Sequence, residues 1–306
     1  MGSPMSSEFY TLGIDIGGTH FRMGLVGKEG QVLAYEKHPT AVLMGEDPAA
    51  LLGDAISEYC LRHGARDHVV AACIGLPATV DKARERVLNA PNVRGFDGVP
   101  LGRILRKRLG VPVLIERDVN VQLLADMRRL DIQSGDVLAC YVGTGIGNAI
   151  LLGGALLTGH HGVAGELGHI PFGDSQQPCG CGNTGCAEGL AGGLYLAALA
   201  RDVFCRTPIE ELFVRHGEAA ELREYIERLG RVIATEINIL DPEVLLLGGG
   251  VIGMAGFPKA MLEKSIRAHT RKPLPHDGLR ILYSAGNDGK GGVLGAGIFA
   301  WRSITE

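Results

Sequence analysis

The chain has 306 residues, with 30 basic and 34 acidic side chains and a formal net charge of -4. Its length exceeds the size at which one hydrophobic core usually stops growing, so we expect two domains. It contains no polybasic run and no apolar stretch of about 20 residues, so we expect no nucleic-acid partner and no membrane span. A small-molecule ligand is the better expectation.

Taken in chain order, the apolar pattern predicts strands and helices in alternation. Residues 10–16 and 21–26 are predicted as two strands joined by a glycine turn, and residues 137–152 repeat this unit. Buried strands are also expected over 69–76, 113–116 and 244–247, and helices over 48–63, 101–109, 218–240, 258–270 and 291–301. This alternation indicates an α/β fold with two similar halves.

Two glycine-rich turns are candidate phosphate-binding loops. The first comprises Asp15, Gly17, Gly18, Thr19 and His20, and the second comprises Gly143, Thr144, Gly145 and Gly147. Backbone amides and hydroxyls in such loops bind phosphate oxygens, and an acid such as Asp15 can hold Mg²⁺ through water. Each loop alone is also typical of an ordinary hairpin turn. Their recurrence in both halves predicts a site for the polyphosphate of ATP.

A third glycine motif, Gly248, Gly249 and Gly250, follows the predicted strand 244–247. Together with Gly253 it matches the dinucleotide pattern G-x-G-x-x-G, which keeps a nicotinamide-dependent oxidoreductase as an alternative. Only 53 residues follow Gly253, too few for the rest of a dinucleotide-binding domain. We therefore expect the triple glycine to lie against the nucleoside of ATP.

One histidine and three cysteines lie close together in the sequence: His169, Cys179, Cys181 and Cys186. This set suits a closed tetrahedral zinc site, and the intervening glycines permit the tight turns that direct several sulfurs inward. The alternative is a pair of ordinary thiols plus a disulfide. The other four cysteines lie in apolar contexts typical of free thiols in a reducing compartment, so we expect a cytoplasmic protein.

Asp118 lies where a predicted strand leads into a helix, in the run Glu116-Arg117-Asp118-Val119-Asn120. A carboxylate at this position could orient a hydroxyl for phosphoryl transfer. It could equally be the N-cap of a helix that begins near Val119. The local sequence leaves both interpretations open.

Three stretches, residues 15–19, 165–169 and 179–188, resemble in this order the signatures of ROK-family sugar kinases. The resemblance extends from about Thr11 to Trp301. It implies an α/β fold of the actin-like ATPase (ribonuclease H-like) type, with two domains and a cleft between them. The implied ranges are an N-terminal domain over 8–118, a C-terminal domain over 119–290, and a C-terminal helix over 291–306 that packs back toward the N-terminal domain.

The resemblance also implies an activity and residue roles. The γ-phosphate of MgATP would pass to the 6-hydroxyl of a hexose, with Asp118 as the base. Asn92, Glu166, His169 and Glu188 would bind the sugar together with Asp118. His169 would bind zinc through one ring nitrogen and donate to the sugar through the other. The two glutamates could otherwise be solvated surface acids. A homodimer is expected, as in similar proteins.

Within the family, residues 117–120, 161–171 and 271–276 are most similar to bacterial D-allose kinases. Arg117 stands where many family kinases have Asn, and Ala78 where Gly is usual, and both lie near the expected sugar pocket. We therefore expect D-allose as the substrate. A glucokinase or an N-acetylmannosamine kinase is the alternative within the family, and a catalytically silent sugar-binding regulator is the alternative outside catalysis.

Overall fold

The computed structural model describes residues 8–133, 135–285 and 288–305. The chain forms two compact units. Unit 1 comprises Met1–Gln133, Thr158–Ala164 and Ala285–Glu306, and unit 2 comprises Ser134–Leu157 and Gly165–Ser284. These ranges differ from the expected domains 8–118 and 119–290, since the helix that begins at Asp118, the segment 158–164, Ala285 and residues 288–290 group with unit 1.

Unit 1 contains a five-stranded sheet in the order β3-β2-β1-β4-β7. The strands are β1 (Tyr10–Ile16), β2 (His20–Val26), β3 (Val32–Pro39), β4 (Val69–Leu76) and β7 (Val113–Arg117). β1, β4 and β7 are parallel, and β2 and β3 pair antiparallel. The two central strands are almost continuously apolar and buried, which is typical of a sheet covered on both faces.

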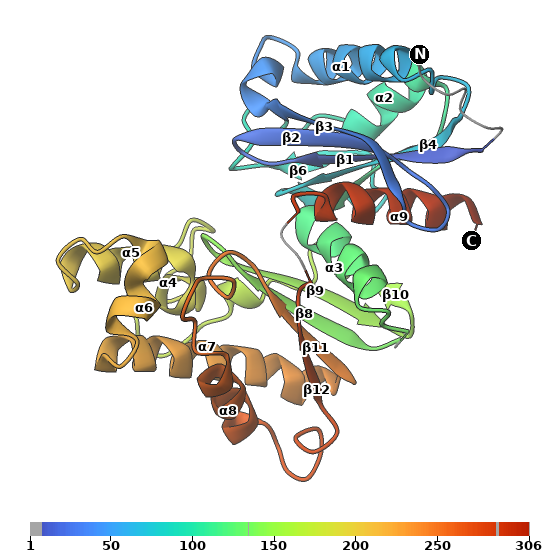
Figure 1. Cartoon of the computed structure of the whole chain (residues 1–306). Helices are drawn as coiled ribbons and strands as arrows, with labels where there is room; N and C mark the ends of the chain where they lie inside the picture. The colour runs from blue at the N-terminus through green and yellow to red at the C-terminus, as the bar shows by residue number, and fades with distance from the viewer. Residues whose placement is uncertain (1–7, 134, 286–287, 306) are drawn as a thin grey trace. The chain divides into compact units, whose positions relative to one another are not determined.

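Helices cover both faces of the unit 1 sheet (Figure 1). The helices α1 (Pro48–Arg62) and α2 (Leu101–Leu109) lie on one face, and α3 (Asp118–Arg129) and α9 (Gly291–Thr305) lie on the other. Helix α1 begins where the Asp47 side chain accepts a hydrogen bond from the Ala50 amide, with Pro48 in the first turn. Helix α2 ends at Gly110, which has a positive φ of 75°.

Small residues allow α9 to pack closely against the rest of unit 1. A side chain at Gly295 would collide with the Val121 carbonyl of α3, and one at Gly13 of β1 would collide with the Val293 carbonyl of α9. The last helix of the chain therefore contacts β1, β4 and α3. This packing explains why α3 belongs to unit 1. Glu306, the last residue of the expected range, lies outside the described residues.

Unit 2 has a second five-stranded sheet in the order β10-β9-β8-β11-β12. The strands are β8 (Val137–Val142), β9 (Ile146–Leu152), β10 (Ala155–Leu156), β11 (Val244–Gly248) and β12 (Arg280–Tyr283). β8, β11 and β12 are parallel, while β9 and β10 pair antiparallel. This is the pairing pattern of the unit 1 sheet, so the expectation of two similar halves is confirmed.

The largest helices of unit 2 are α7 (Ala220–Leu240) and α8 (Lys259–His269), which pack against each other. Gly230 of α7 lies so close to Ser265 of α8 that a side chain there would overlap the serine. Three shorter helices, α4 (Glu188–Ala191), α5 (Gly193–Asp202) and α6 (Leu212–His216), complete this side of the unit. The buried apolar stripe of α7 forms the centre of the core.

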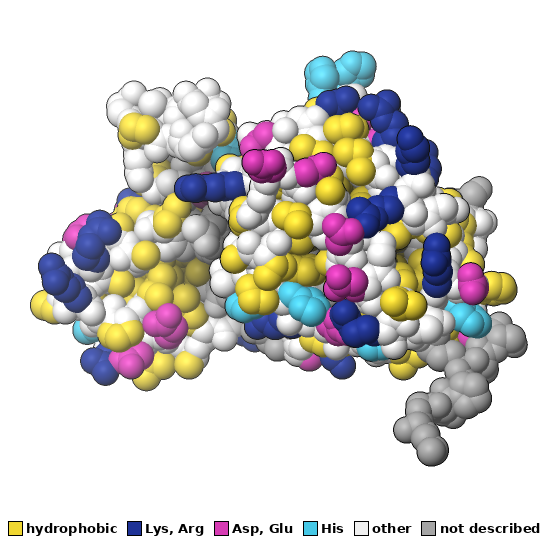
Figure 2. Space-filling view, turned by 90° about the horizontal axis from the view of Figure 1, so that it is seen from above, with side chains coloured by type: hydrophobic (Ala, Val, Ile, Leu, Met, Phe, Trp, Pro, Cys, Tyr) yellow, Lys and Arg dark blue, Asp and Glu magenta, His cyan; other side chains and the backbone are white. Residues whose placement is uncertain are grey.

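The remaining short elements are the hairpin of β5 (Thr79–Val80) and β6 (Val87–Asn89), and single 3-10 turns at Thr40–Leu43, Leu167–His169 and Ile209–Glu211. Within the described ranges, no helix combines the length with the apolar character that a bilayer span requires. On the face drawn in Figure 2, basic and acidic side chains both occur among hydrophobic ones. Among the described residues, a partly exposed ion pair joins Arg106 to Glu85 at 2.8 Å.

Candidate active site and metal centre

The candidate residues of unit 1 gather where its parallel strands end. Asp15 of β1 lies beside Gly75 of β4, which in turn pairs with Glu116 of β7. Because parallel strands share one direction, the first glycine turn and the β7–α3 junction lie at the same edge of the sheet. Ligands of open α/β sheets bind at this carboxyl edge. The edge therefore brings Asp15 and Asp118 to one side of unit 1.

The first glycine turn, Gly17–Thr19, connects β1 and β2. The Gly17 amide donates to the His20 carbonyl at 2.9 Å, so the turn is closed by backbone. Thr40 supports it from outside, because its hydroxyl donates to the Gly17 carbonyl at 2.6 Å and its amide donates to the Thr19 carbonyl. Gly18 and Thr19 remain exposed. His20 begins β2 rather than continuing the turn.

The Asp15 carboxylate forms an ion pair within unit 1. Its Oδ2 accepts a hydrogen bond from Arg22 at 3.0 Å, across the β1–β2 pair. Gly292, at the start of α9, leaves space for the carboxyl group, since a side chain there would collide with Asp15. Burial raises the pKa of Asp15, and the Arg22 charge acts in the opposite direction. The sequence interpretation missed Arg22, which the register of a hairpin places opposite Asp15.

Asp118 is the first residue of α3, and its Oδ1 accepts a hydrogen bond from the Val119 amide at 2.8 Å. Arg117, not Asp118, is the residue that precedes the helix. Burial raises the pKa of Asp118 to about 6, and the negative charge of Asp15 adds to this rise. A carboxylate with this pKa is ionised at neutral pH and close to its titration range, as a proton acceptor requires.

A buried acid holds the main chain just ahead of Asp118. The Glu116 carboxylate accepts hydrogen bonds from the Arg117 amide and from the Asn120 side chain, both at 2.8 Å, and forms an ion pair with Arg84. The Arg117 guanidinium donates to the carbonyl of Ala164. Ala164 ends the segment that precedes Gly165 and Glu166. Arg117 was predicted to lie near the sugar pocket, whereas Glu116 and Arg84 were not among the predicted site residues.

Asn92, one of the predicted sugar ligands, is exposed in the loop after β6. Its carbonyl oxygen lies near the first glycine turn, where a side chain at Gly18 would approach it to 3.1 Å. Asn92 therefore lies beside the first glycine turn in unit 1.

The second glycine turn, Gly143–Gly145, connects β8 and β9 in unit 2. It is shorter than expected, because β9 already begins at Ile146 and Gly147 pairs with Tyr141 inside the sheet. The start of α5 supports the turn: the Gly193 amide donates to the Gly143 carbonyl at 3.0 Å, and the Leu194 amide donates to the Thr144 carbonyl at 2.9 Å. The turn is consequently fixed, while Thr144 is exposed to solvent.

The triple glycine lies at the same carboxyl edge of the unit 2 sheet. Gly248 ends β11, and a side chain there would overlap Tyr141 and Ser284 of the neighbouring segments. Gly249 has a φ of 95° and lies against the Val142 backbone. A side chain at Gly250 would meet nothing within 4 Å. Packing therefore explains the first two glycines of the motif but not Gly250.

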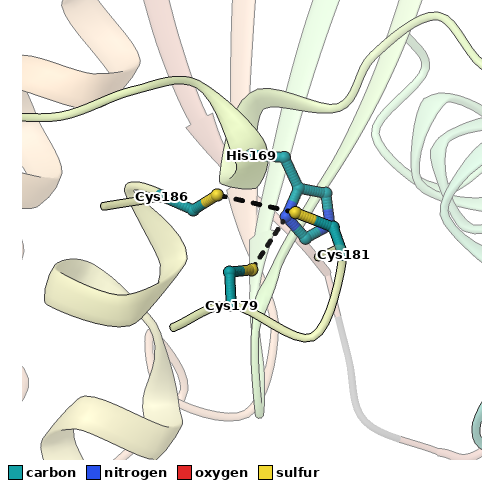
Figure 3. A group of neighbouring side chains, drawn as sticks. All are labelled: His169, Cys179, Cys181 and Cys186. Carbon is teal, nitrogen blue, oxygen red and sulfur yellow. Dashed lines mark hydrogen bonds between the residues drawn. The ribbon is translucent and has the colours of Figure 1, made fainter. Parts of the chain in front are cut away.

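The four predicted metal ligands come together in unit 2 (Figure 3). One ligand atom from each of His169, Cys179, Cys181 and Cys186 lies within 4.8 Å of all the others. His169 Nδ1 lies 3.5 Å from Cys179 Sγ, and the sulfurs of Cys181 and Cys186 are 3.6 Å apart. We call this set the metal knuckle.

These distances fit a tetrahedral zinc ion. With Zn–S bonds of about 2.3 Å and Zn–N bonds of about 2.1 Å, tetrahedral ligand atoms lie roughly 3.6–3.8 Å apart. A disulfide would need about 2.05 Å between sulfurs, and all seven cysteines are free thiols in the structure. The donor set and its spacing therefore suit zinc and not a disulfide.

His169 presents its two ring nitrogens to different partners. Nδ1 faces the metal knuckle, whereas Nε2 lies 3.8 Å from Glu166 Oε2. That separation is longer than a hydrogen bond. Both side chains are partly exposed. The pair can therefore offer a donor and an acceptor to one hydroxyl-bearing ligand.

Glu188 is the first residue of α4 and directly follows the metal knuckle through Cys186 and Ala187. Its Oε2 accepts a hydrogen bond from the Ile146 amide, at 2.9 Å, beside the second glycine turn. The predicted sugar ligands Glu166, His169 and Glu188 thus belong to unit 2, with the second glycine turn. Asp118, Asn92 and the first glycine turn belong to unit 1.

Comparison with known proteins identifies relatives along the whole chain. The sequence pattern of the ROK family matches residues 11–303. A glucokinase of Thermotoga maritima is 30% identical over 261 residues, which cover 78% of this chain and 81% of the relative. An N-acetylmannosamine kinase of Salmonella heidelberg is 30% identical over 301 residues, covering 95% and 98%.

Solved structures show the same similarity. A ROK hexokinase from Thermus thermophilus has a TM-score of 0.81 and 28% identity, and the match covers 97% of this chain and 99% of that one. A ROK glucokinase from Streptomyces griseus, in complex with glucose and AMPPNP, has a TM-score of 0.74 and 29% identity over 96% and 99%. The predicted fold class is confirmed: the chain has the two-domain α/β fold of the actin-like ATPases.

Proposed function

Because the chain belongs to the ROK family and is an ATP-dependent sugar kinase, we propose that it transfers the γ-phosphate of MgATP to the 6-hydroxyl of a hexose, with D-allose preferred. The observation that carries the proposal is the pair of glycine turns at the carboxyl edges of two sheets with the same strand order. Each turn offers backbone amides to phosphate oxygens.

In this proposal Asp118 accepts the proton of the sugar hydroxyl. Phosphoryl transfer has a loose transition state, so the carboxylate mainly orients the hydroxyl toward the phosphorus. Asp15 would hold Mg²⁺ through water, where the ion would supply positive charge to the phosphate oxygens. The Arg22 guanidinium, 3.0 Å from Asp15 Oδ2, keeps the Asp15 carboxylate in place. Residues Gly17–His20, Gly143–Gly147 and Gly248–Gly250 bind the nucleotide.

Glu166, His169 and Glu188 bind sugar hydroxyls, together with Asn92 and Asp118. His169, Cys179, Cys181 and Cys186 would hold zinc, and binding through one ring nitrogen would fix the tautomer and the direction of the His169 ring. The separation of 3.8 Å between His169 Nε2 and Glu166 Oε2 supports this assignment, since one hydroxyl within hydrogen-bonding distance of both atoms can accept from the imidazole and donate to the carboxylate.

The choice of hexose depends on Arg117 and Ala78. The relatives described above are named glucokinase and N-acetylmannosamine kinase, which supports those substrates as the alternative. The D-allose assignment rests on Arg117 as a departure from the common family pattern, and its guanidinium donates to the Ala164 carbonyl, two residues before Glu166. One displaced polar contact changes discrimination between epimers by orders of magnitude.

A panel of hexoses tests the proposal. D-allose, D-glucose, D-mannose, D-fructose, N-acetylmannosamine and N-acetylglucosamine are compared by ADP release at equal enzyme concentration. We expect the highest kcat/KM with D-allose. A preference for D-glucose or N-acetylmannosamine would reject D-allose as the substrate but would not affect the assignment as a sugar kinase.

A sugar-binding regulator is the second candidate function. A ROK family transcriptional regulator has a TM-score of 0.81 and 26% identity, and this chain covers 76% of its length. Sugar binding by calorimetry without ADP release on any hexose of the panel would support this candidate. We also propose a homodimer in the cytoplasm, and sedimentation of the purified protein checks the dimer.

A further inference from the structure

The Glu188 carboxylate occupies the space beside the second glycine turn. Its Oε2 accepts the Ile146 amide at 2.9 Å. A Cβ atom on Gly145 would have three nearest neighbours, all from this carboxyl group. It would overlap Oε2 and Cδ and press against Oε1. Gly145 is therefore a glycine because Glu188 fills the place of its side chain.

The segment that leads to Glu188 is held in place by its neighbours. Cys186, a member of the metal knuckle, and Ala187 precede it, and both are buried. The Ala187 amide donates to the carbonyl of Ile170 at 3.0 Å, which ties this segment to the residue after His169. A side chain at Gly168, next to His169, would approach Glu188 Oε2 to 3.4 Å. The carboxylate thus lies packed between the knuckle and the turn.

We propose that Glu188 is a positioning residue for the nucleotide: its carboxylate braces the second glycine turn and couples it to the metal knuckle. The inference rests on the proposed function, in which this turn binds phosphate. A hydrogen bond from a backbone amide to a carboxylate is stronger than one between neutral groups. Loss of the brace releases the Ile146 amide and the adjoining turn, so nucleotide affinity falls as well as sugar affinity.

Two substitutions of Glu188 separate bracing from sugar binding. Glu188→Gln keeps an oxygen that can accept the Ile146 amide but removes the charge, whereas Glu188→Ala removes the acceptor. We expect ADP affinity, measured by calorimetry without sugar, to fall about tenfold in Glu188→Ala and less than threefold in Glu188→Gln. Equal ADP affinity in wild type and Glu188→Ala would overturn the proposal.

A double-mutant cycle tests the contact directly. Gly145→Ala alone places a methyl group against the carboxylate, so we expect ADP affinity to fall about tenfold. In the Glu188→Ala background the methyl group has room, so Gly145→Ala should add less than a twofold loss. Strictly additive losses would overturn the brace. Gly143→Ala is the matched control for coupling, because its side chain would meet nothing within 4 Å and its effect should add to that of Glu188→Ala.

The same variants separate this inference from the proposed function. If wild type binds no ADP, the nucleotide site of the proposed function is wrong. The brace is then judged by melting temperature, which needs no ligand. We expect Gly145→Ala to lower Tm by about 3 °C in wild type and by less than 1 °C in Glu188→Ala. Equal losses in both backgrounds would overturn the brace independently of any activity.

Discussion

At the scale of single residues, Asp118 combines two properties that its sequence context left as alternatives. It begins α3 and accepts the Val119 amide, and it also lies at the carboxyl edge of the sheet with Asp15. A carboxylate can accept from a backbone amide and still have lone pairs for a substrate hydroxyl. The helix-start interpretation and the catalytic interpretation therefore do not exclude each other.

Replacing the Asp118 carboxylate tests its catalytic role. Asp118→Asn keeps the size and the acceptor for the Val119 amide but removes the proton acceptor. We expect turnover to fall at least about a hundredfold, the range that general base catalysis contributes. Sugar and ATP binding by calorimetry should change little. Turnover near that of wild type would remove Asp118 as the base.

The pKa of Asp118 predicts the pH dependence. Burial raises this pKa to about 6, and the base must be deprotonated to act. Activity should therefore be low below pH 6 and should rise to a plateau above it. We expect kcat/KM for the sugar, measured from pH 5 to pH 8, to show an inflection near pH 6 in wild type. The residual rate of Asp118→Asn should show no inflection near pH 6. A flat wild-type profile would contradict the assignment of Asp118 as the base.

Arg117 connects the segment of Asp118, the proposed base, with the segment that leads to Glu166. Its hydrogen bond to the Ala164 carbonyl is charge-assisted, and such bonds contribute about 1.5–3 kcal/mol. We expect Arg117→Met to raise KM for the sugar about tenfold or more, with a smaller effect on KM for ATP. Arg117→Lys keeps a cationic donor and should recover part of the loss. The matched control is Arg103→Met on the exposed surface of α2, and an equal effect there would contradict a specific role.

At the scale of elements, the short knuckle segment has few apolar residues, so under the proposed function we expect its order to depend on the bound metal. Cys179 and Cys181 are partly or fully exposed, and only Cys186 of the three cysteines is buried. Bound metal contributes directly to the stability of such a segment. Because Glu188 follows two residues after Cys186, order in the knuckle also decides where α4 begins.

Metal removal tests the knuckle as an element. We expect one zinc per chain by elemental analysis, and chelation should lower both Tm and sugar affinity. Cys179→Ser should lose the zinc, whereas Cys205→Ser should keep it, because Cys205 is an exposed thiol outside the knuckle. A chelated protein with unchanged Tm and sugar affinity would exclude a shared role for His169.

At the scale of the whole molecule, the chain returns to unit 1 after completing unit 2. Helix α9 packs between β1 and α3 through glycines on both sides of the contact. Close approach of backbones requires the absence of side chains there, so these glycines have a packing role rather than a ligand-binding role. The stability of unit 1 therefore depends on the end of the chain.

A methyl group at the α9 contact tests this dependence. Gly295→Ala would force the Val121 carbonyl and α9 apart, and overpacking of this kind costs about 1–3 kcal/mol. We expect Tm to fall by about 5 °C. Gly278→Ala is the control, because its nearest neighbour would be a flexible leucine atom at 3.4 Å. Equal Tm for both variants would contradict the close packing of α9.

The sequence by itself determined the elements whose signals are local. The strand Val69–Leu76 and the helix Leu101–Leu109 were predicted with their observed bounds, because apolar runs and helical spacing depend on neighbouring residues. The ligand types of the knuckle were also evident, since three thiols and an imidazole lie close together in the chain. The short strands β10 and β12 were missed, because only pairing with β9 and β11 defines them.

Only the tertiary structure decided which distant residues meet. Thr40 supports the first glycine turn, Arg117 reaches Ala164, and Glu188 fills the place of a side chain on Gly145. The grouping of α3 in unit 1 belongs to the same class of facts, whereas the family resemblance already implied that the last helix packs back toward the N-terminal domain. Hydrophobic burial is non-directional and fixes no pairing, whereas close packing and satisfied hydrogen bonds select one arrangement for the whole chain at once.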